Sequence, residues 1–293
     1  MHMRTAFITI LFTLLTISLV SAEVYRFDEH DNVIGSIKKH TTKHEESLIE
    51  VARKYDLGFN EIADANPELD PFVPGDGVTV IIPTSWILPE VSSYKGIVIN
   101  LSEMRLYYFF KKNKSVLVKT FPLGIGAEGS NTPEGTFTVI EKTVKPSWHV
   151  PESILKERPD SPKVVPPGPK NPLGSHALRL SLPTILIHGT NRPFGIGRTV
   201  SHGCIRLYPE DIPKLFKLVP TGTQVTIIRQ PIKVGVENKN VYIEVHNDKQ
   251  IHLDYFDEAV KILKKKKLLK NVNTEKFYWA VKEKKGIPVN ISN

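Results

Sequence analysis

The sequence predicts a mainly β central domain flanked by a small strand–helix–helix–strand module and a small α+β unit. Three observations predict this organisation. Short runs rich in β-branched and aromatic residues recur between residues 94 and 230, helical periodicity is confined to the two flanks, and the 22 prolines outnumber the 18 glycines. A chain of 293 residues with 40% hydrophobic residues can form two or three packed domains, which excludes wholesale disorder.

Residues 1–22 have the pattern of a secretory signal peptide. Arg4 supplies the basic end, residues 6–20 form an apolar run, and small residues up to Ala22 suit cleavage. The run is shorter than the ~20 apolar residues of a membrane span, and no later run is long enough. We therefore expect an exported mature chain without a transmembrane segment.

Residues 36–84 predict the strand–helix–helix–strand module. Leu48, Ile49, Ala52 and Tyr55 recur at helical spacing, residues 59–66 form a second helical turn before Pro67, and residues 78–82 are a strand.

Residues 94–230 predict the central β domain. The expected strands are residues 97–101, 105–110, 116–122, 135–141, 177–180, 185–188 and 224–229. Eight of the 22 prolines lie between Pro146 and Pro172. Such a segment is either a functional loop or lid, or a rigid surface excursion, and the pattern does not separate the two.

Residues 231–293 predict the α+β unit, with a strand at residues 241–245 and an amphipathic helix at residues 255–269. Four consecutive lysines at residues 264–267 indicate either a solvated face or contact with an anionic polymer or lipid headgroups. The formal charge of +8 favours an anionic partner in general. Because no basic–aromatic platform or helix-turn-helix pattern is present, we expect no nucleic-acid partner.

The chemistry is concentrated around Cys204, the only cysteine, which excludes an intramolecular disulfide. In an exported chain, a lone cysteine is either a reactive thiol or a buried inert residue. A nearby imidazole lowers the pKa of a thiol and accepts its proton, and His188 and His202 are the local candidates. His202 would share a face with Cys204 in an extended strand. A loop rich in glycine could fold His188 back to the thiol.

The neighbours of Cys204 suit acyl chemistry. The amides of Gly203 and Cys204 could stabilise an oxyanion, and Arg206 could bind a substrate carboxylate or hold the loop. As an alternative, His188, His202 and Cys204 could be three zinc ligands. No nearby acidic residue stands out as a general base for a zinc enzyme, so we expect no metal. Covalent catalysis by the thiol also requires no organic cofactor. A chance cluster in a β core is the third alternative.

The motif residues resemble those of the YkuD-type L,D-transpeptidase family, which carries a histidine, a spacer and then Ser-His-Gly-Cys followed by arginine. Here fifteen residues separate His188 from Cys204 in Ser201-His202-Gly203-Cys204. The segments I-V-I-N-L-S-E-M-R-L-Y-Y-F, F-P-L-G-I-G, T-P-E-G-T-F and P-P-G-P-K-N-P-L-G extend the likeness. Residues 36–84 also resemble a LysM carbohydrate-binding module, through S-L-I-E-V-A-R-K-Y, A-N-P and P-G-D-G-V-T-V-I-I-P. That likeness departs at the first loop, residues 44–48, so a structural spacer is the alternative.

The resemblance implies an L,D-transpeptidase-type mixed β-sheet fold and acyl transfer on peptidoglycan stem peptides. Cys204 would be the nucleophile and His188 the general base, which the carbonyl of Gly189 would orient. The amides of Gly203 and Cys204 would stabilise the oxyanion, with supporting positions at Ser201, His202 and Arg206.

In the implied reaction the thiolate attacks the carbonyl of the third-position diamino acid, releases D-Ala and leaves a thioester. An amine of another stem, or a lysine of an envelope lipoprotein, would then accept the acyl group. Water as acceptor would make the protein an L,D-carboxypeptidase. A non-catalytic protein that binds peptidoglycan stems and glycan is the alternative from another class, and the expected compartment is the periplasm.

Overall fold

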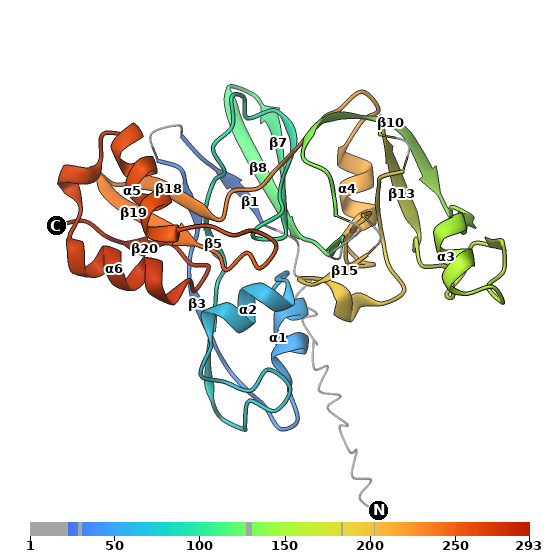
Figure 1. Ribbon diagram of the computed structural model, residues 1–293, viewed down its shortest axis with the longest axis horizontal. Helices are drawn as coiled ribbons and strands as arrows, with labels where there is room; N and C mark the ends of the chain where they lie inside the picture. The colour runs from blue at the N-terminus through green and yellow to red at the C-terminus, as the bar shows by residue number, and fades with distance from the viewer. Residues whose placement is uncertain (1–22, 29–30, 127–130, 183, 202) are drawn as a thin grey trace, which may run out of the picture.

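A large curled β-sheet forms the centre of the molecule (Figure 1). The computed structural model describes residues 23–28, 31–126, 131–182, 184–201 and 203–293. Helices α1 and α2 lie on one side of the sheet, and the C-terminal unit lies at the end opposite helix α3 (Figure 1). The predicted signal peptide, residues 1–22, lies outside the described residues.

The central sheet has nine strands, and all seven strands predicted for the central domain are among them. The spatial order is β1 (Val24–Arg26), β8 (Ser115–Pro122), β7 (Arg105–Lys112), β6 (Gly96–Asn100), β17 (Gln224–Ile228), β10 (Gly135–Val144), β13 (His176–Leu180), β14 (Leu186–His188) and β16 (Ile205–Arg206). Within this sheet, as far as the chain is described, β6–β17 and β14–β16 are the parallel pairs and the others are antiparallel. Strand β10 changes partner from β17 to β13 and carries a bulge between Val139 and Glu141, which bends the sheet.

The central strand β6 is buried on both faces, because alternate residues of a strand point to opposite sides. Ile97 and Ile99 join the core beneath helix α4 (Ile212–Leu218), whereas Val98 joins a second core. That second core includes Leu48 and Ile62 of the N-terminal module. The module therefore covers one face of the sheet and belongs to the same packed body.

The N-terminal module has the predicted order of elements. It contains β3 (Lys38–Thr41), α1 (Leu48–Lys54), α2 (Phe59–Ala65) and β4 (Thr79–Ile82), with β3 and β4 antiparallel. Ser47 and Glu50 form a reciprocal capping box that begins α1. Residues 23–35, before this module, contain β1 and β2 (Val33–Gly35). Strand β1 joins the central sheet, and β2 pairs with β5 (Ser85–Ile87).

The C-terminal unit packs two helices on a small sheet. The sheet consists of β18 (Ile232–Glu237), β19 (Asn240–Val245) and β20 (Val289–Asn290), and the helices are α5 (Tyr255–Lys265) and α6 (Thr274–Glu283). Helix α5 ends at Lys265, earlier than predicted, and Lys267 just beyond it adopts a left-handed φ of 58°. Lys265 and Lys266 each lie 2.9 Å from Glu90, so part of the lysine run is ion-paired.

The proline-rich segment is ordered by a short ribbon and a helix. Strands β11 (Trp148–His149) and β12 (Val164–Val165) flank α3 (Glu152–Glu157). Asn171 closes the segment, since its side-chain amide donates to the carbonyl of Pro146 at 2.9 Å and its oxygen accepts from the amide of Leu173 at 2.8 Å.

Two further short strands, β9 (Ile125–Gly126) and β15 (Thr199–Ser201), pair in parallel. In the described part of the chain, no helix has the length and apolar character that crossing a membrane requires.

Candidate active site

The parallel pair of strands β14 and β16 brings the histidine and the cysteine of the sequence motif into one neighbourhood. His188 lies opposite Arg206 in this register, and the carbonyl of His188 accepts from the amide of Leu207 at 2.9 Å. Cys204 immediately precedes β16. Its thiol receives a hydrogen bond from the amide of Leu186, two residues before His188. Residues sixteen positions apart are thus joined by strand pairing.

His188 is buried and held in one tautomer. Its Nδ1 lies 2.6 Å from the carbonyl oxygen of Gly189. A carbonyl can only accept, so Nδ1 carries the proton and the other ring nitrogen of the neutral imidazole keeps its lone pair. Burial and the charge of Arg206 lower the pKa of His188 to about 4. Hydrogen bonds to the backbone of Gly189 and Leu173 raise this pKa, but by less than burial and Arg206 lower it. The imidazole is therefore neutral at pH 7 and able to accept a proton.

The Cys204 thiol is also neutral at rest. Burial raises the pKa of the thiol, and this effect outweighs the Leu186 amide and the Arg206 charge, which both lower it. The thiol lies 3.6 Å from the carbonyl oxygen of Thr184. The sequence pattern predicts a thiol pKa lowered by imidazole, and the direction differs because desolvation dominates. At rest, therefore, the thiol of Cys204 and the imidazole of His188 are both uncharged.

Two glycines shape the surroundings of this pair. A Cβ on Gly189 would lie 2.9 Å from Cγ2 of Ile212, so a side chain there would push against helix α4. Gly203 adopts a φ of 92°, a left-handed conformation that glycine allows at little cost. The carbonyl of Gly203 accepts a hydrogen bond from Oγ1 of Thr132 at 2.9 Å. Sequence reasoning did not single out Thr132, although it lies in the T-P-E-G-T-F segment.

The backbone of Arg206 forms hydrogen bonds within the fold, whereas one nitrogen of its side chain does not, among the described residues. Its amide and carbonyl pair with Gly124 at 2.8 and 2.9 Å, which holds the strand without help from the side chain. Among the described residues, its buried Nε has no hydrogen-bond partner. Ser201 ends strand β15, whereas His202 lies outside the described residues.

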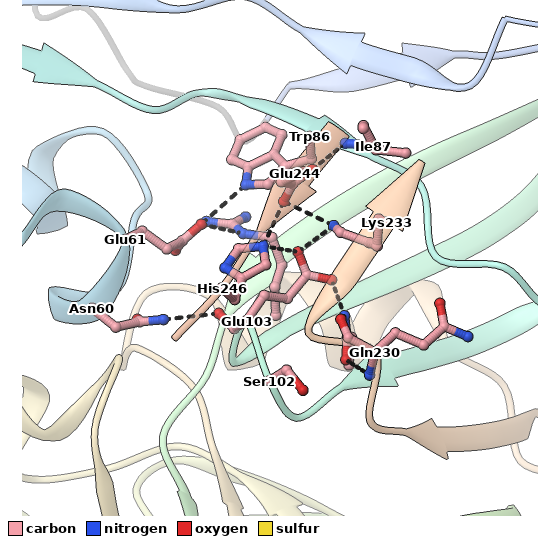
Figure 2. Close-up of polar contacts among 12 residues, drawn as sticks. Asn60, Glu61, Trp86, Ile87, Ser102, Glu103, Gln230, Lys233, Glu244 and His246 are labelled. Atoms are coloured by element: carbon pink, nitrogen blue, oxygen red, sulfur yellow. Dashed lines mark hydrogen bonds and ion pairs between the residues drawn. The ribbon is translucent and has the colours of Figure 1, made fainter. Parts of the chain in front are cut away.

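A second cluster of titratable groups lies where the central sheet, the N-terminal module and the C-terminal unit meet (Figure 2). The ligand atoms of Glu103, Glu244 and His246 lie within 4.8 Å of one another, close enough for a metal ion. However, Nζ of Lys233 lies 2.6 Å from Glu103 and 2.9 Å from Glu244. Burial lowers the pKa of Lys233, but the two carboxylates outweigh it and the net shift is upward. The lysine ammonium supplies the positive charge that a metal would bring.

Strand pairing brings the segment of the single thiol next to the segment of a neutral, oriented imidazole. A thiol and an imidazole are the residue types that serve as nucleophile and base in acyl-transferring enzymes. A family model described as the L,D-transpeptidase catalytic domain, YkuD, matches residues 94–227. The chain is 42% identical to the probable L,D-transpeptidase YcfS of Escherichia coli over 225 residues, 73% of this chain and 69% of that one. It is 38% identical to the probable L,D-transpeptidase ErfK/SrfK of Salmonella typhimurium over 254 residues, 82% of this chain and 81% of that one.

Among solved structures, an L,D-transpeptidase from Mycobacterium smegmatis matches 52% of this chain and 63% of its own, with 20% identity and a TM-score of 0.36. The chain belongs to the YkuD-type L,D-transpeptidase family. It is an enzyme of the transpeptidase class.

Proposed function

We propose that this protein transfers acyl groups between peptidoglycan stem peptides, with Cys204 as the nucleophile and His188 as the general base. The observation that carries the proposal is the β14–β16 register, which aligns His188 with Arg206 and leaves Cys204 immediately before β16. The fixed Nδ1 proton of His188 supports a base that works through its other nitrogen.

The reaction begins as the sulfur of Cys204 attacks the carbonyl of the third-position diamino acid and the thiol proton passes to His188. The amides of Gly203 and Cys204 stabilise the oxyanion, and one such donor typically changes the rate by about 10²- to 10³-fold. The tetrahedral intermediate collapses as the protonated His188 gives its proton to the leaving amine of D-Ala. A thioester remains on Cys204.

An acceptor amine then attacks the thioester, His188 removes a proton from that amine, and the thiol is restored. The acceptor is the side-chain amine of another stem, which forms a cross-link, or a lysine at the end of an envelope lipoprotein. Nε of Arg206 has no hydrogen-bond partner in the part of the chain that the structure describes, which supports a role for this residue in binding a carboxylate of the stem. Ser201 and His202 are assigned supporting positions.

We further propose that the protein is exported to the periplasm by residues 1–22 and is divided into units at residues 36–84, 94–230 and 231–293. The strand–helix–helix–strand order of the first unit supports a LysM-like module that holds glycan strands. The excess of positive charge suits an anionic envelope polymer.

The test is product analysis by mass spectrometry after the protein is incubated with a tetrapeptide stem and two acceptors, a second stem and a lysine-ended peptide. We expect release of D-Ala and a new amide bond to one acceptor. The Cys204→Ala variant should form no product while still binding sacculi. Trimmed stems without a new amide bond would identify an L,D-carboxypeptidase, and binding without any product from the wild type would identify a non-catalytic peptidoglycan-binding protein.

A further inference from the structure

A buried threonine hydroxyl connects Gly203, next to Cys204, with Gly126 of the parallel strand pair β9–β15, called the β9–β15 ribbon below. Thr132 is 4% exposed, and its Oγ1 accepts from the amide of Gly126 at 3.1 Å. The same Oγ1 donates to the carbonyl oxygen of Gly203 at 2.9 Å. The hydroxyl thus accepts from Gly126 with its oxygen and donates its proton to Gly203. Thr132 is therefore held as a donor to the turn that carries the nucleophile.

The peptide group that Thr132 contacts is the one that matters most for acyl transfer. The carbonyl of Gly203 and the amide of Cys204 belong to a single planar peptide group. A hydrogen bond to its carbonyl fixes the orientation of the plane and therefore the direction in which the Cys204 N–H points. It also polarises the group, which makes the N–H a stronger donor. Gly203 needs such a fixed partner, because glycine has wide backbone freedom.

The C-terminal unit also contacts Gly126 of the β9–β15 ribbon. The side-chain amide of Gln250 donates to the carbonyl of Gly126 at 3.2 Å, and its oxygen accepts from Nη2 of Arg229 at 3.0 Å. Arg229 in turn donates to Asp248 at 2.6 Å. Asp248 also accepts from the hydroxyl of Ser102 at 2.8 Å. Gln250 is thus held in one orientation, so its contact with Gly126 joins the C-terminal unit to the support of the turn.

We propose that Thr132 is a positioning residue that orients the Cys204 amide toward the oxyanion, and that Gln250 lets the C-terminal unit hold the ribbon on which Thr132 rests. The proposal rests on the proposed function of Cys204 as the nucleophile. It gives the C-terminal unit a part in catalysis that is distinct from binding a ligand.

The test compares Thr132→Val, which keeps the shape but removes the hydroxyl, with Thr132→Ser, which restores it. The probe is p-nitrophenyl acetate, whose acyl group bonds to the sulfur while p-nitrophenolate leaves and His188 takes the thiol proton. We expect Thr132→Val to slow the acylation burst by ~10- to 100-fold with a small change in KM, because the oxyanion donor is misaligned. We expect Thr132→Ser to recover most of the rate.

Alkylation of Cys204 by iodoacetamide is the second readout, because displacement of iodide forms no oxyanion. The rate and its pH profile should match the wild type in Thr132→Val. A matched control is Thr120→Val, which removes another buried threonine hydroxyl that bonds Arg105 at 3.0 Å and Leu106 at 2.9 Å. We expect this control to acylate at the wild-type rate. An equal loss in Thr120→Val, an equal loss of alkylation, or no recovery in Thr132→Ser would overturn the proposal.

Gln250→Glu tests the contribution of the C-terminal unit. The carboxylate can still accept from Arg229 but cannot donate to Gly126, so we expect acylation to slow by ~3- to 10-fold. The exposed substitution Gln224→Glu is the control and should have no effect. A wild-type rate in Gln250→Glu would refute the role of the C-terminal unit. Because p-nitrophenyl acetate needs no stem recognition, a wild type that acylates this ester but ignores stem peptides would refute the proposed function alone.

Discussion

The buried charges at the junction of the three units and the buried groups at the active site follow opposite rules. At the junction, Arg105 contacts Glu61 at 2.8 Å, and Lys233 contacts Glu103 at 2.6 Å. At the active site, the buried Nε of Arg206 has no hydrogen-bond partner among the described residues, and burial keeps His188 neutral. The comparison separates groups that hold the fold from groups that remain available for chemistry.

The buried groups of the two regions contribute differently to the stability of the folded protein. A buried ion pair gains little net stability, because desolvation offsets most of the attraction, but removal of one partner leaves a costly uncompensated charge. The junction therefore fixes the relative position of the units more than it stabilises them. An unpartnered donor at the active site costs stability, and a substrate group could satisfy it.

The largest expected effect is on the active-site side of the comparison. His188→Asn removes the general base, and we expect acylation to slow by ~10²- to 10⁴-fold while the protein stays folded. Stopped-flow acylation and circular dichroism measure the two properties. His252→Asn, a substitution of an exposed histidine in the C-terminal unit, should have no effect. Acylation by His188→Asn at the wild-type rate would remove His188 from the mechanism.

On the junction side, Arg105→Met should destabilise the protein by ~3–5 kcal/mol, because Glu61 remains buried without its partner. The double variant Arg105→Met/Glu61→Leu should recover much of this loss. Denaturant unfolding measures both, and Arg179→Met at an exposed pair is the control. If the double variant is no more stable than Arg105→Met, the cost does not arise from an uncompensated charge.

The neutral state of His188 predicts a pH dependence of stability. Its folded pKa of about 4 lies below the ordinary value of 6.5, so the unfolded chain binds the proton first as pH falls. The contribution is fully present above pH 6.5 and is lost as pH falls toward 4, by about 3 kcal/mol in total. Wild type minus His188→Gln, measured by unfolding at a series of pH values, should show this loss. A difference that does not change with pH would show that His188 is not buried in its neutral form.

The smallest expected effect concerns an exposed contact between the module and the catalytic domain. Arg53 donates to both carboxylate oxygens of Glu210, at 2.8 and 2.9 Å, and both side chains are about 40% exposed. A double-mutant cycle with Arg53→Ala and Glu210→Ala should give a coupling of ~0.2–1 kcal/mol that falls with added salt. A coupling of several kcal/mol would place this pair with the buried junction pairs.

The sequence predicted the elements of the fold better than their contacts. Strands such as β7 and β17 carry local patterns of β-branched and aromatic residues, and the helices of the module carry helical spacing. Strand β16 was missed because its two residues pair with segments distant in the sequence, β14 and Gly124. Strand β1 was missed because its three residues lie before the first clear turn signal.

At the candidate site, the motif predicted roles for His188 and Cys204 but gave no sign of the groups that contact this part of the chain. Thr132 and Gly203 are 71 residues apart, and Glu103 and Lys233 are 130 residues apart. No local periodicity links residues at such separations, since their contact depends on how the sheet closes. The direction of the Cys204 pKa was equally inaccessible, because it depends on burial.

The central claim is that Cys204 carries the acyl group, and intact-protein mass spectrometry during turnover tests it most directly. With a tetrapeptide stem and no acceptor amine, we predict an adduct with the mass of the stem minus D-Ala, and peptide mapping should locate it on Cys204. Hydroxylamine should remove this adduct, as expected for a thioester. Undiminished product formation by Cys204→Ala, or an adduct on another residue, would contradict the account.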